Sequence, residues 1–97
     1  MHEHKLARQL VPTFEQLARE NNLTKITRLV LDVGMLHAVE ADFLVHSFEH
    51  AFEGNSLLEG AQVEINTIEP GTQVTDGDGH RKPADGWEII VRKIQGE

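Results

Sequence analysis

The spacing of apolar residues changes between two periods along the chain, and this change predicts the order of its elements. In residues 4–21 apolar side chains recur every three or four positions, as on one face of an amphipathic helix. These apolar positions are Leu6, Leu10, Phe14, Leu17 and Ala18. Because a proline inside a helix removes one hydrogen bond, we expect a kink or a restart at Pro12. The same spacing predicts a second helix over residues 40–52.

Three other stretches, residues 25–34, 62–68 and 87–94, are rich in β-branched and aliphatic side chains and predict strands. In the first, apolar residues alternate with Arg28 and Asp32, which predicts one face in the core. The last is apolar on both faces, which is typical of a central strand. Residues 69–85, rich in Gly, Asp, Thr and Pro, are expected to form a loop with a glycine-rich turn.

The order helix, strand, helix, strand, strand predicts an α/β (α+β) fold in two layers, with two helices on one three-stranded sheet. The first two strands and the helix between them are expected to form a crossover unit, and the last two strands a hairpin with a long loop. At 97 residues, the chain fits a single domain over residues 1–97. The order of the strands in the sheet is not readable from this pattern.

Composition excludes several classes of partner. A formal net charge of -7 repels phosphate backbones and anionic lipid, so we expect no nucleic-acid or membrane partner. The chain has no cysteine, which excludes disulfides and thiolate zinc sites, and no zinc is expected. No apolar run approaches the roughly 20 residues that span a bilayer, and the amino terminus lacks the apolar segment of a signal peptide. We therefore expect a cytoplasmic protein.

The first three residues, Met1, His2 and Glu3, offer a compact set of metal donors. The terminal amine, the amides of His2 and Glu3, and the His2 imidazole lie within reach of one small ion if Met1 is retained. A planar array of nitrogen donors suits nickel or copper better than zinc. Each bound amide must lose its proton, so the affinity should fall in mild acid. The alternative is an ordinary frayed terminus without a ligand.

Other polar residues extend this hypothesis. The Glu3 and Glu40 carboxylates are available as a ligand or as a support for one, although Glu40 could simply offset a helix dipole. His46 and His50 are four residues apart and could present two imidazoles to one ion, but a solvated helix face is the favoured interpretation. His4 and His37 are candidates for auxiliary ligands or ordinary surface residues.

Several short segments together resemble the HypA/HybF family of hydrogenase maturation proteins. The segments are Met1-His2-Glu3, residues 28–34, Val39-Glu40, Phe48-Glu49, Glu59-Gly60-Ala61 and residues 91–94. The resemblance implies that Met1, His2 and Glu3 bind nickel (Ni2+), with the acidic Glu40 beside them. It also implies delivery of nickel to the large subunit of a [NiFe] hydrogenase, with a HypB-like GTPase as partner, and in some organisms a supply of nickel to urease.

The chain departs from this family between its last two predicted strands. Members of the family carry a zinc module with two Cys-x-x-Cys pairs there, whereas residues 71–84 contain no cysteine. We therefore expect a nickel-binding accessory protein, not an enzyme, that acts as a monomer or homodimer. The alternative is a HypA-like protein-interaction module that has lost metal regulation along with the zinc module.

Overall fold

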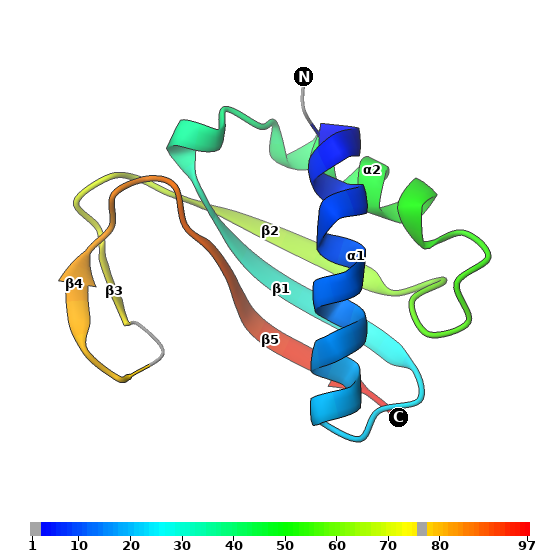
Figure 1. Cartoon of the computed structure of the whole chain (residues 1–97). Coiled ribbons are helices and arrows are strands. Elements are labelled where there is room, and N and C mark those ends of the chain that lie inside the picture. The colour runs from blue at the N-terminus through cyan, green and yellow to red at the C-terminus, as the bar shows by residue number, and fades with distance from the viewer. Residues whose placement is uncertain (1–2, 76–77) are drawn as a thin grey trace.

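A computed structural model describes residues 3–75 and 78–97 of the chain (Figure 1). Its helices are α1 (Glu3–Glu20), a single 3-10 turn η1 (Met35–His37) and α2 (Ala41–Phe52). Its strands are β1 (Ile26–Gly34), β2 (Gln62–Ile68), β3 (Gln73–Thr75), β4 (Arg81–Pro83) and β5 (Ile89–Gly96). The expected order of two helices and three long strands is confirmed. Within the described residues, no helix is long and apolar enough to cross a bilayer.

Helix α1 continues through Pro12, so of the two expectations for that residue the restart is wrong, while the kink stays a prediction. Residues on both sides of the proline are fully buried in the same core, Ala7 before it and Phe14 and Ala18 after it. A break would turn one of these halves away from the core. Packing of the apolar face therefore outweighs the hydrogen bond that Pro12 cannot make.

The main sheet has the strand order β2-β1-β5, with β1 parallel to β2 and antiparallel to β5. The expected hairpin between the last two long strands is wrong, because β5 pairs with β1 and not with β2. The central strand is also β1 and not β5. In agreement with its position, β1 is buried without interruption from Leu29 to Gly34, whereas the residues of β5 are half-buried or exposed.

The segment expected to be a loop contains a second, smaller sheet. Strands β3 and β4 pair in antiparallel register as a hairpin, with Val74 opposite Lys82. Val74 packs with Ile68, Ala84 and Ile90 in a small cluster separate from the main core. Figure 1 shows this hairpin to one side of the main sheet, away from both helices. The sequence pattern missed it because each strand has only three residues.

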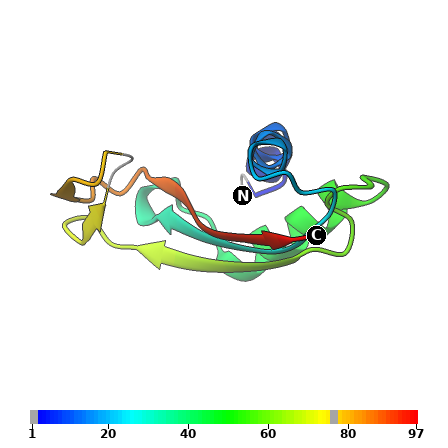
Figure 2. The same ribbon diagram turned by 90° about the horizontal axis from the view of Figure 1, so that it is seen from below.

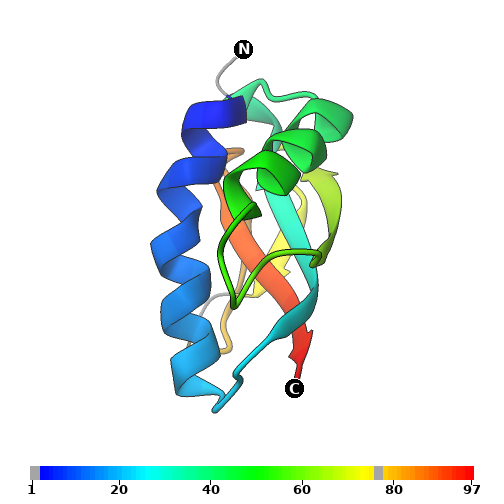
Figure 3. The same cartoon turned by 90° about the vertical axis from the view of Figure 1, so that its right-hand side faces the viewer.

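Both helices contribute to one core with the sheet. Figure 2 shows α1 lying across a face of the sheet, and Figure 3 shows α1 and α2 next to each other. Three aromatic rings join the helices: the ring centroids of Phe14 and Phe48 are 5.6 Å apart, and those of Phe14 and Phe52 are 6.1 Å apart. Leu29, Leu31 and Val33 complete this core from β1. The predicted two-layer arrangement is confirmed.

The opposite face of β1 carries a buried acid that was expected to be exposed. Asp32 is only 5% exposed, because Arg92 of β5 donates two hydrogen bonds to its Oδ2 atom, one of them from Nε at 2.8 Å. Asn66 of β2 donates to Oδ1 at 3.4 Å. The register between β1 and β5 shifts beside Arg92, as in a β-bulge, which accommodates an extra residue in β5. Partners on both neighbouring strands therefore allow this carboxylate to be buried.

Candidate metal centre

The start of α1 lies beside the start of α2. Glu3 is the first residue of α1, and Glu40 is the residue that immediately precedes α2. The backbone N–H of Glu40 donates a hydrogen bond to Glu3 Oε2 at 3.1 Å. Glu3 is buried, whereas Glu40 is exposed and its side chain does not cap α2. The structure therefore brings the Glu3 carboxylate to the backbone of Glu40, while Glu40 itself is exposed.

The hydrogen bonds around Glu3 favour its charged form. The pKa of its carboxyl is lowered from the usual 4.5 to about 2, first by a hydrogen bond with the amino terminus and then by the backbone N–H of Glu40. A carboxylate with this pKa is ionised throughout the physiological range. It can therefore serve as an oxygen donor, or hold a neighbouring ligand, without first losing a proton.

We expect the contribution of Glu3 to stability to depend on pH in a defined direction. Because folding lowers the pKa of this carboxyl, its stabilising contribution is fully present above about pH 4.5 and is lost as the pH falls toward 2. Glu3→Gln removes the titrating group. Urea unfolding of the metal-free proteins at pH 7 and pH 3 should show a smaller difference in stability between wild type and variant at pH 3. A difference that is equal at both pH values would contradict this account.

Of the four predicted metal ligands, the structure describes Glu3 and Glu40, while Met1 and His2 lie outside the described residues. Nickel binding by Met1, His2, Glu3 and Glu40 therefore stays a prediction. Among residues 3–75 and 78–97, no three or more His, Cys, Asp or Glu side chains are grouped so that they could hold a metal ion.

The auxiliary histidines divide into two locations. His37 lies in the turn before α2, where its Nε2 is 2.8 Å from the carbonyl oxygen of Trp87 and its ring meets the indole edge-on. It is thus tied to the segment that leads into β5. His46 and His50 lie together on α2, with their Nε2 atoms 3.2 Å apart. The ring of His4, from α1, meets that of His50 at a centroid distance of 6.2 Å.

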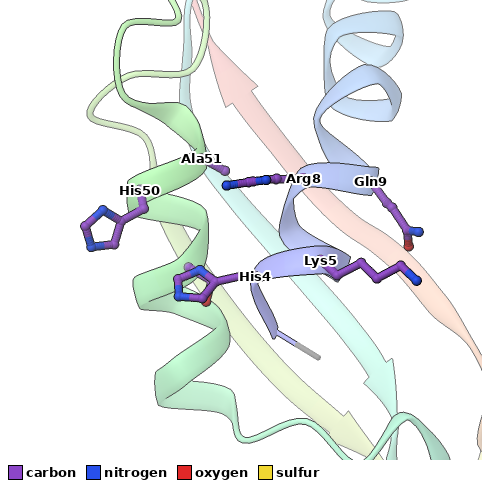
Figure 4. A pocket seen from close by; sticks show the side chains of 7 residues that line it. His4, Lys5, Arg8, Gln9, His50 and Ala51 are labelled. Carbon is purple, nitrogen blue, oxygen red and sulfur yellow. The ribbon is translucent and has the colours of Figure 1, made fainter. Parts of the chain in front are cut away.

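A groove between α1 and α2 lies beside these histidines (Figure 4). Its lining residues are His4, Lys5, Arg8, Gln9, Ser47, His50 and Ala51. Figure 4 shows His4 and Arg8 extending from α1 toward α2, while Lys5 and Gln9 point away. The sequence did not predict that Lys5 and Arg8 line this groove. Helical spacing places both residues on the polar face of α1, but it does not show that this face lies next to α2.

The fold, in which the starts of α1 and α2 meet, defines a small two-layer α/β domain. Solved structures of this type include the Ni metallochaperone HypA from Helicobacter pylori, with a TM-score of 0.75 over 99% of this chain and 97% of that one. Another HypA structure has a TM-score of 0.64 and covers 100% of this chain and 97% of its own. Sequence identities of 19% and 21% mean that these likenesses establish the fold.

Residues 1–80 match the family model described as "Hydrogenase/urease nickel incorporation, metallochaperone, hypA". The chain belongs to the HypA family, as its sequence resemblance predicted. It is 38% identical over 72 residues to the hydrogenase maturation factor HypA of Albidiferax ferrireducens, covering 74% of this chain and 62% of that protein. The corresponding factor of Dechloromonas aromatica is 28% identical over 98% of both chains. In the first of these matches, the chain spans about six tenths of its relative's length.

Proposed function

We propose that this chain is a nickel metallochaperone, an accessory protein for the maturation of a [NiFe] hydrogenase or another nickel enzyme. The observation that carries the proposal is the hydrogen bond from the Glu40 backbone to the Glu3 carboxylate. This hydrogen bond fixes the beginning of α1 beside the exposed residue Glu40. A metal ion bound by the residues before Glu3 would therefore lie close to acidic residues. Because the chain belongs to the HypA family, whose model is described by nickel incorporation, we infer that the ion carried is nickel.

In this proposal the protein binds and releases nickel by ligand exchange and catalyses no reaction. Met1 would supply the terminal amine, His2 its imidazole and amide, and Glu3 its amide. Nitrogen donors of this kind suit nickel. The Glu3 and Glu40 carboxylates would contribute an oxygen ligand or hold the terminus in position. We place this exchange in the cytoplasm.

The partners in this proposal are a HypB-like GTPase and the large subunit of the hydrogenase. The chain offers no cysteine for the zinc module described for the family, and the short β3–β4 hairpin occupies the region between β2 and β5. Contacts with these partners would therefore use the two-layer domain itself.

Calorimetric titration of Ni2+ into untagged protein that begins with Met1 tests the proposal. The protein should bind one ion tightly near neutral pH and more weakly in mild acid, because the ligands must be deprotonated. His2→Ala should abolish the tight site, since it removes the imidazole of the chelate. One residue added before Met1 should also weaken binding, because it converts the terminal amine to an amide.

His80→Ala is the matched control for His2→Ala, because His80 is exposed and lies beyond the main sheet, next to β4. The control should keep the tight site. Unchanged nickel affinity in His2→Ala would rule out the terminal chelate.

A second candidate function, a protein-interaction module without metal handling, is favoured by exposed apolar side chains on one part of the surface. Met35, Leu36 and Trp87 are 48%, 45% and 58% exposed. The backbone N–H of Leu36 donates to the carbonyl of Gly86 at 2.9 Å, which holds these two segments together. Exposed aromatic and methionine side chains are enriched where proteins meet. This function predicts binding to the GTPase that is independent of nickel and unchanged in His2→Ala.

A further inference from the structure

We propose that α2 carries a second metal site, in which His46 and His50 bind one divalent transition-metal ion as a two-imidazole chelate. The two residues lie one turn apart on the exposed side of the helix. Imidazole is a ligand for nickel, copper and zinc, so the site would take an ion of this class. It does not depend on the terminal chelate and goes beyond the function proposed above.

The distance between the two rings fits one ion. Their Nε2 atoms are 3.2 Å apart. Metal–imidazole bonds are about 2.0–2.1 Å long, and two such bonds across this separation would enclose an angle of about 100° at the metal. This angle lies between those of square-planar and tetrahedral coordination. The helix therefore already holds both donors at the spacing that a shared ion requires.

A neighbouring carboxylate places the lone pair of His50 where the ion would bind. Glu53 Oε1 lies 3.3 Å from His50 Nδ1, so the carboxylate favours a proton on Nδ1 and leaves Nε2 of His50 unprotonated. In the metal-free pair, Nε2 of His46 then donates to Nε2 of His50. When the ion binds, it takes the place of this shared proton, and His46 carries its proton on Nδ1 instead.

The surroundings leave the remaining coordination positions open. His50 is 54% exposed at its side chain, and the described residues provide no third metal ligand in a group with these two. Lys5 and Arg8 line the adjoining groove and add positive charge on the α1 side. Two ligands, with solvent at the other positions, make a site that exchanges its ion readily. His4 meets His50 across the groove, which places the pair close to the beginning of α1.

Titration of Ni2+ alone into the His2→Ala protein separates this site from the terminal one. This protein should bind one Ni2+, and the paramagnetic ion should selectively broaden the imidazole NMR signals of His46 and His50. The double variants His2→Ala/His46→Ala and His2→Ala/His50→Ala should each lose this binding. His2→Ala/His80→Ala is the matched control and should keep it. His46, His50 and His80 are exposed, and circular dichroism checks that each variant remains folded.

The role of Glu53 has its own test. Glu53→Gln in the His2→Ala background should weaken Ni2+ binding by about tenfold, the lower end of the range for a partner of a ligating histidine. The proposal is overturned if His2→Ala binds no Ni2+, or if removing His46 or His50 leaves its affinity and its broadened signals unchanged. Because every protein in this comparison lacks His2, failure of the terminal chelate does not affect either outcome.

Discussion

Phe48→Ala should destabilise the fold by about 3–5 kcal/mol, the usual cost of removing a large aromatic side chain from a core. Phe48 is fully buried on α2. Its ring centroid lies 5.6 Å from those of both Phe14 and Phe52. The truncation would leave a cavity between both helices and the sheet that neighbouring rings cannot fill without leaving their own positions. Leu31→Ala, on the central strand, should cost about 2–5 kcal/mol.

Equilibrium unfolding in urea measures both effects, with His46→Ala as the control. His46 lies on the same helix, but it is exposed, so its truncation should change stability by less than about 0.5 kcal/mol. If His46→Ala were more destabilising than Phe48→Ala, the packing of α2 against the core described above would be wrong.

Gly34→Ala should have an effect of similar size for a different reason. A Cβ atom at this position would lie 2.1 Å from the carbonyl oxygen of Gly86 and 2.8 Å from the backbone nitrogen of Trp87. These are backbone atoms and cannot rotate away. The clash would push the end of β1 from the segment before β5 and break the hydrogen bond from Gly34 N–H to Glu88. We expect a loss of about 3 kcal/mol or more, the upper part of the range for overpacking.

Gly60→Ala is a suitable comparison in the same urea experiment. Gly60 has a φ of +82° with open space around its Cβ position, so alanine there meets only backbone strain, about 1–2 kcal/mol. Gly34→Ala should therefore be the more costly substitution. Equal losses at both positions would mean that β1 and the Gly86–Trp87 segment can separate easily.

Local patterns predicted the elements well, because burial of one face leaves a period in the sequence. Phe14 and Phe48 follow the helical spacing, and Leu29 and Leu31 the strand spacing, and all four are fully buried. The pairing of strands leaves no such trace. Whether β5 lies beside β2 or β1 depends on where the crossover through α2 leaves room, and this is a property of the whole chain. Asp32 was misplaced for the same reason, since its partner Arg92 belongs to β5.

Only part of the candidate metal centre was predictable from the sequence. The resemblance to the HypA family named Glu3 and Glu40 together, and the structure places the Glu40 backbone on the Glu3 carboxylate. Helical spacing alone put His46 and His50 on one face of α2. It could not reveal that their Nε2 atoms converge to 3.2 Å or that Glu53 lies beside His50, because these details depend on side-chain rotamers.

The central position of β1 has a consequence for how the protein is made. This strand is synthesised well before its antiparallel neighbour β5, and Ile26 pairs with Gly96, which lies far from it in the sequence. Until then, one side of β1 has unpaired backbone groups that can pair with another nascent chain. The pairings that complete the sheet are distant in sequence, which slows their formation. The risk of aggregation is therefore greatest during synthesis, before β5 pairs with β1.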